Sequence, residues 1–162
     1  KENSNSSDLS FAKEYFEYIS KETYNDIILC GHSKGGNLAI YASLFCSDKC
    51  KKNIAGVYNY DGPGFNEDVL QNALLIKNKP CIKTFLPQDS IIGLLLEQYS
   101  DLITIKSNEK NGLMQHDAFS WNVNPTTFEI LDSTNKRSIV IDHTITKFLK
   151  NVSKDKRKYV LL

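Results

Sequence analysis

Apolar residues along the chain form two kinds of run: short continuous runs and longer runs with helical spacing. The continuous runs predict buried strands of a parallel sheet, because such strands are covered on both faces. The spaced runs predict amphipathic helices. In the first of these, the spaced apolar positions are Leu9, Ala12, Phe16 and Ile19. We expect strands at 26–30, 54–60, 81–86 and 102–107, and helices at 8–22, 35–46, 66–77, 138–150 and from about 153.

The alternation of strands and helices predicts an α/β fold with a mostly parallel sheet covered by helices. Residues 91–98 predict a short apolar helix or a lid-like segment, and residues 118–131 a small hairpin or extended pieces. Residues 1–7 are polar and predict a disordered lead-in or linker. Residues 8–162 then form one domain, which suits the length of 162 residues.

The charge of the chain is nearly balanced, with 20 basic and 19 acidic side chains and a net charge of +1. This balance argues against nucleic acid or an anionic membrane as the main partner. The sequence contains no apolar run long enough to span a bilayer. We therefore expect a cytoplasmic protein without stable membrane insertion.

The four cysteines predict free thiols, because they form neither a Cys-x-x-Cys pair nor a zinc-finger spacing. Cys30 and Cys81 lie in strand-like apolar runs, so we expect both to be buried. Cys46 and Cys50 are expected to be neighbours at a helix end. Free thiols favour a reducing compartment. The three histidines lie in unrelated contexts, so we predict no metal site and no cofactor.

The segment "GHSKG" at 31–35 joins the strand at 26–30 to the helix at 35–46. A Gly-x-Ser-x-Gly turn in this context is typical of a nucleophilic serine, because small residues two positions before and after it let strand and helix pass closely. We therefore predict Ser33 as the nucleophile and the backbone N–H of Lys34 as an oxyanion donor. The alternative is a structural turn whose serine caps the helix.

A serine nucleophile needs a base and an orienting acid, and in α/β-hydrolases the chain order is serine, acid, histidine. Asp89 ends the second strand after Ser33, and His116 follows the third. We predict Asp89 as the acid and His116 as the base. Asp61, which follows the strand at 54–60, is the alternative acid.

For two other histidines and one apolar segment the sequence gives a less specific prediction. His32 is expected to pack or form a hydrogen bond beside the serine, and His143 to lie on the surface or pack along the helix at 138–150. The apolar segment at 91–96, with Leu113 and Met114, either lines an acyl pocket or lid or belongs to the ordinary core.

Four segments in order, "GHSKGGNLAIYAS", "YNYDGPGF", "PQDSIIG" and "QHDAFSW", resemble a bacterial family of lipase-like α/β-hydrolases. The arrangement is more distantly similar to the class 3 triacylglycerol lipases. The resemblance spans residues 11 to 160. It implies a three-layer α/β-hydrolase fold and hydrolysis of a carboxylic ester through Ser33, Asp89 and His116. It also implies an acyl ester or lipid-like substrate.

The family also has an earlier strand that ends in a Phe-Arg-Gly-Thr-like turn and supplies a second oxyanion donor. Residues 1–24 contain no match to it. The resemblance therefore implies a catalytic C-terminal part whose sheet is incomplete on the N-terminal side. An uncovered sheet edge favours pairing with a second copy. Two alternative functions are a non-catalytic binding or scaffolding domain and an acyltransferase or thioesterase.

Overall fold

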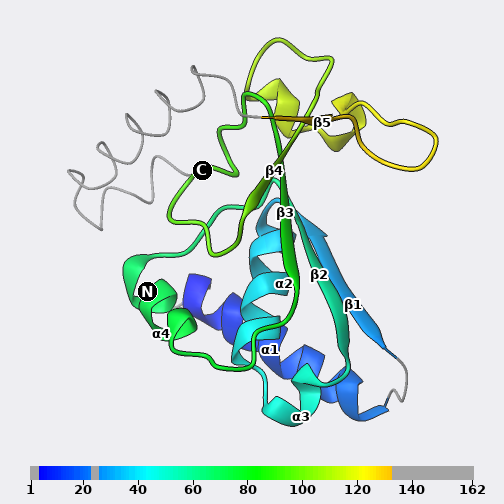
Figure 1. Cartoon of the computed structure of the whole chain (residues 1–162). Coiled ribbons are helices and arrows are strands. Elements are labelled where there is room, and N and C mark those ends of the chain that lie inside the picture. The colour runs from blue at the N-terminus through cyan, green and yellow to red at the C-terminus, as the bar shows by residue number, and fades with distance from the viewer. Residues whose placement is uncertain (1–3, 23–25, 133–162) are drawn as a thin grey trace.

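A computed structural model describes residues 4–22 and 26–132, which form a five-stranded sheet flanked by helices (Figure 1). The strands lie in the order in which they follow one another in the chain. The first four are parallel, and the fifth runs antiparallel to its neighbour. The strands are β1 (Ile27–His32), β2 (Ile54–Tyr60), β3 (Ile82–Pro87), β4 (Leu102–Ile105) and β5 (Ile130–Leu131). The predicted α/β fold with a mostly parallel sheet is confirmed.

Four α-helices and two short 3₁₀ helices occur in the described residues. They are α1 (Ser4–Glu22), α2 (Lys34–Phe45), α3 (Asp48–Lys51), α4 (Glu67–Leu74), η1 (Met114–His116) and η2 (Ala118–Ser120). Helix α1 begins at Ser4, inside the predicted lead-in. Residues 91–98 form turns and no helix, and they close on an isolated antiparallel bridge between Phe65 and Glu97. The predicted helices after residue 137, with His143, lie outside the described residues.

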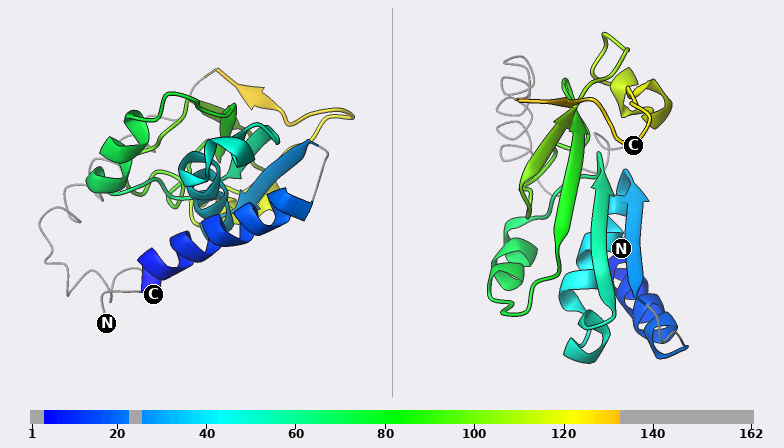
Figure 2. Two further views of the ribbon diagram at one scale, coloured as in Figure 1. Left: turned by 90° about the horizontal axis from the view of Figure 1, so that it is seen from below. Right: turned by 45° about the vertical axis from the view of Figure 1, so that its right-hand side comes forward.

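Helix α2 lies between α1 and the sheet, and it packs against β1 and β2 (Figure 2). Its buried face joins Ile40 and Leu44 to Val57 of β2 in the main hydrophobic cluster. A second cluster joins Phe16 of α1 to Ala42, Cys46 and Cys50. Burial of these side chains fixes α2, and therefore fixes the residue at which β1 turns into α2.

The other face of β1 is open in the described part of the chain. Ile28 is 61% exposed, and Cys30 is also exposed. The prediction that Cys30 and Cys81 are buried is wrong, although both are free thiols. Cys30 is exposed because of its position. β1 is an edge strand of the described sheet, and no described element covers this part of its face.

No helix within the described residues is both long enough and apolar enough to cross a bilayer. The same residues contain no cluster of three His, Cys, Asp or Glu side chains placed to hold a metal ion. All four cysteines lie in this part of the chain, and each is free.

The contrast between buried and exposed thiols predicts selective alkylation of the folded protein. Burial, more than the neighbouring Cys50, raises the pKa of Cys46 to about 11. At about pH 8 only about one Cys46 side chain in 1,000 is then the reactive thiolate. We expect iodoacetamide to modify Cys30 and Cys81 and to spare Cys46, with all four reacting after denaturation. Peptide mass spectrometry measures this, and equal rates at Cys30 and Cys46 in the folded protein would contradict it.

Candidate active site

Ser33 occupies the sharp turn between β1 and α2, with φ 57° and ψ −130°. For a residue other than glycine this left-handed conformation costs on the order of 1–3 kcal/mol, so the surrounding structure must hold it. The Ser33 N–H donates to the carbonyl of Tyr60 (2.9 Å), and the Ser33 carbonyl accepts from the N–H of Gly36 (3.0 Å). The Ser33 side chain makes no capping hydrogen bond to α2, so the alternative of a helix-capping serine is wrong. Lys34 is the first residue of α2, one residue before the expected start of this helix.

Two glycines allow β1 and α2 to approach each other at this turn. A Cβ on Gly31 would overlap the backbone of Gly35, and a Cβ on Gly36 would overlap the amide of Asn59. A Cβ on Gly35 would meet no atom within 4 Å. The close approach therefore requires Gly31 and Gly36, whereas the motif pattern assigned this requirement to Gly31 and Gly35.

The residue that contacts the His116 ring is Asp61. Its Oδ2 lies 2.7 Å from Nδ1 of His116, the last residue of η1. The Asp61 side chain is fully buried, and its Oδ1 accepts hydrogen bonds from the hydroxyl of Ser90 and the N–H of Gly93. Asp61 follows β2 directly and has φ 51°, so the chain turns sharply at this carboxylate. Donors from two loops beyond β3 and β4 thus meet at one carboxylate.

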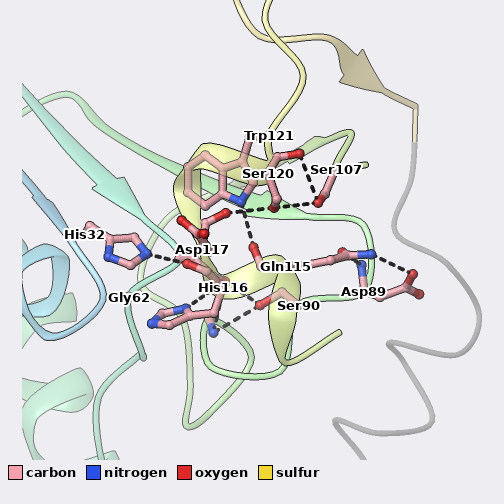
Figure 3. Close-up of polar contacts among 12 residues, drawn as sticks. His32, Gly62, Asp89, Ser90, Ser107, Gln115, His116, Asp117, Ser120 and Trp121 are labelled. Carbon is pink, nitrogen blue, oxygen red and sulfur yellow. Dashed lines mark hydrogen bonds and ion pairs between the residues drawn. The ribbon is translucent and has the colours of Figure 1, made fainter. Parts of the chain in front are cut away.

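Asp89, the predicted acid, faces a different partner. Its carboxylate accepts from Nε2 of Gln115 (3.2 Å), and its N–H donates to Oε1 of the same side chain (2.9 Å), as Figure 3 shows. Gln115 is fully buried, so this pair fixes the loop that carries His116 to the end of β3. The structure therefore corrects the choice of carboxyl beside His116 from Asp89 to the alternative, Asp61.

The contact with Asp61 defines the chemistry of the His116 ring. An ionised carboxylate only accepts hydrogen bonds, so Nδ1 of His116 carries a proton and the lone pair of the neutral ring lies on Nε2. The ring can then accept a proton at Nε2 while Asp61 stabilises the cation that forms. Burial, more than the nearby Cys30, raises the pKa of Tyr60, whose ring packs against Phe85 and Trp121.

The prediction that His32 forms a hydrogen bond beside Ser33 is confirmed. Its Nε2 lies 2.7 Å from the carbonyl oxygen of His116, and the two rings lie side by side. The Ser33 turn, the carboxylate of Asp61 and the loop that carries His116 therefore converge at the carboxyl ends of the parallel strands. Ligands of open α/β sheets bind at this edge.

A family model for Mbeg1-like proteins matches residues 5–161, which is nearly the whole chain. The chain belongs to the Mbeg1-like family. Mbeg1-like proteins are a lipase-like α/β-hydrolase family, so membership suggests a hydrolase. This agrees with the resemblance found in the sequence. A search of curated proteins found no match.

Two buried asparagines of this Mbeg1-like chain hold the loop that begins at Asp61, and sequence reasoning missed both. The Nδ2 of Asn37 in α2 donates to the carbonyls of Pro63 and Gly64 (3.1 and 2.9 Å). The Oδ1 of Asn59 in β2 accepts from the N–H of Gly62 (3.0 Å). Both lie in otherwise apolar runs, and a buried amide must find hydrogen-bond partners. That interruption of the apolar pattern was the signal that could have identified them.

Proposed function

We propose that the chain is a serine hydrolase of carboxylic esters, with Ser33 as nucleophile, His116 as base and Asp61 as the acid that orients the base. The observation that carries this proposal is the 2.7 Å contact between His116 Nδ1 and the buried carboxylate of Asp61. The strained backbone of Ser33 supports it, because unfavourable conformations of this kind cluster at functional sites. Membership of a lipase-like hydrolase family supports it as well.

In the proposed reaction, Ser33 Oγ forms a bond to the acyl carbon while its proton passes to Nε2 of His116. The carbonyl oxygen becomes an oxyanion near the start of α2. There the N–H of Lys34 and the positive end of the helix dipole favour negative charge. His116 gives the proton to the leaving alcohol, and the acyl group stays on Ser33. Water then attacks the acyl carbon while His116 takes its proton. The bond to Ser33 Oγ breaks as His116 returns the proton to that oxygen, and the carboxylic acid is released.

Apolar side chains around the base support an acyl ester or lipid-like substrate. Leu113 and Met114 are 51% and 53% exposed, and Phe119 is fully exposed. All three lie within three residues of His116. Exposed apolar groups on the segment that carries the base favour an apolar ligand over a small polar one. An acyl chain that leads away from the carbonyl carbon meets this requirement.

The proposal is tested by labelling the full chain with a fluorophosphonate probe and measuring intact mass. We expect one adduct, which peptide mapping assigns to Ser33 and which is lost in Ser33→Ala. Ser47→Ala is the matched control, because Ser47 caps α3 and lies away from the site, so labelling should persist. An adduct retained by Ser33→Ala would contradict the proposal, because another residue would then be the nucleophile. No adduct on the wild-type chain would also contradict it and would favour a non-catalytic binding domain.

A further inference from the structure

His32 connects the nucleophile's turn to the base through one side chain. It is the last residue of β1 and directly precedes Ser33. Its Nε2–H donates to the carbonyl oxygen of His116, a residue 84 positions away (2.7 Å). The ring centroids of His32 and His116 lie 4.5 Å apart with an angle of 34° between the planes (Figure 3). His32 therefore contacts both the backbone and the ring of the base.

The hydrogen bond from His32 does not depend on the charge of its ring. A carbonyl oxygen only accepts, so Nε2 of His32 must carry the proton in the neutral ring, and it keeps that proton in the cation. The bond is therefore the same whether the ring is neutral or charged. His32 can hold the backbone of His116 in place without taking part in the proton transfers of the reaction.

A second ring N–H supports the same short helix. Trp121 donates its Nε1–H to the carbonyl of Gln115 (2.7 Å), the residue before His116. Helix η1 has only three residues, so carbonyls at its end depend on partners from outside the helix. His32 and Trp121, whose rings meet edge to face with centroids 6.0 Å apart, supply two consecutive carbonyls with donors. The backbone of the base is thus fixed from two sides.

We propose that His32 is a positioning residue, which holds His116 in the correct place relative to Ser33. The inference rests on the proposed function, since it assigns His32 a part in that same reaction. Asp61 fixes the orientation of the His116 ring, and His32 fixes the backbone that carries the ring. Because His32 is bonded to Ser33 through the chain, any shift of the Ser33 turn also moves the donor that holds the base. Ser33 and His116 therefore keep their positions relative to each other when the turn moves.

The test separates the two contacts of His32 with two variants. His32→Phe keeps a ring and removes the donor, whereas His32→Gln keeps an N–H donor near the place of Nε2 and removes the ring. We expect His32→Phe to lower the maximal rate of fluorophosphonate labelling by about 10–100-fold, because a displacement of about 1 Å costs rates of this order. The probe concentration for half-maximal rate should stay within about twofold, and His32→Gln should recover most of the rate. His32 is exposed, and His32→Ala replaces the Phe variant if that protein does not fold.

A second readout does not need activity. Long-range ¹H–¹⁵N NMR spectra report which nitrogen of each histidine carries the proton. We expect the Nδ1–H form of His116 in the wild-type chain and in His32→Gln, and a lower population of it in His32→Phe. This pattern in a chain that the probe does not label would overturn the proposed reaction and uphold the positioning role. Unchanged labelling and an unchanged His116 tautomer in His32→Phe would overturn the inference, as would an Nε2–H form of His116 in the wild type.

Discussion

Replacing Asp61 with asparagine is expected to lower the rate of Ser33 labelling by about 10³–10⁴-fold, as loss of the orienting carboxylate does in serine triads. The amide is neutral, so it no longer stabilises the imidazolium that forms on His116. Its NH₂ group can also donate to Nδ1, which places the ring proton on Nε2 and removes the lone pair that accepts the proton of Ser33. Stopped-flow or quenched labelling with the fluorophosphonate probe measures the rate.

Asp89→Asn is the matched control for this prediction. Asp89 and Asp61 both follow parallel strands, but the Asp89 carboxylate accepts from Gln115. Asparagine keeps the side-chain oxygen that this contact needs, so we expect labelling to fall by roughly tenfold at most, through a small shift of the loop. Slower labelling of Asp89→Asn than of Asp61→Asn would reverse the assignment of the acid.

The second large effect is expected in stability, from Gly31→Ala. A methyl group at this position would overlap backbone atoms of Gly35 and Gly36, and backbone cannot rotate out of the way as a side chain can. Separating β1 from α2 disturbs the packing beneath the Ser33 turn. Overpacking of a tight core typically costs about 1–3 kcal/mol, and we expect a loss of about 3 kcal/mol here. For a chain of this size that lowers Tm by roughly 6–12 °C.

Gly35→Ala tests whether the overlap is the cause. Gly35 is the second residue of α2, and a methyl group there would meet nothing within 4 Å. Alanine favours the helix over glycine by roughly 0.5–1 kcal/mol, so Tm should stay the same or rise. Thermal unfolding followed by circular dichroism compares the two variants. An equal loss in both would mean that the turn needs glycine for another reason.

The four parallel strands were predictable because each is a short apolar run with clear ends, whereas β5 lies in a segment expected to form a hairpin or extended pieces. The bounds expected for β2 agree with the structure, residues 54–60 in both. Strand β1 extends two residues past its expected end, through Gly31 and His32, because it keeps pairing with β2 as far as Tyr60. That pairing depends on the neighbouring strand, so the local pattern of β1 alone did not show it. The local pattern was also insufficient at 91–98. The apolar residues of this segment were compatible with a helix, but the segment forms turns.

The candidate site could be predicted where a local motif places a residue. The Gly-x-Ser-x-Gly pattern predicted the sharp turn at Ser33, and the order of the strands predicted that His116 follows β4 at the same edge of the sheet. The choice between Asp61 and Asp89 was not local, since both carboxylates follow strands on the same edge of the sheet. It depends on Ser90 and Gly93, which donate to Asp61, and on Gln115, which engages Asp89. These contacts join segments about 30 residues apart, which strand counting does not reveal.

The protein contains a single tryptophan, and Trp121 lies against the loop that carries His116. Its indole is almost fully buried and donates to the backbone one residue before the base. Light that excites tryptophan but not tyrosine therefore reads out one known place in the molecule. A change in the intensity or wavelength of this emission when a ligand binds would report movement of the loop that carries His116. The fluorescence of Trp121 in the wild-type chain can therefore be used to follow this loop without an attached dye.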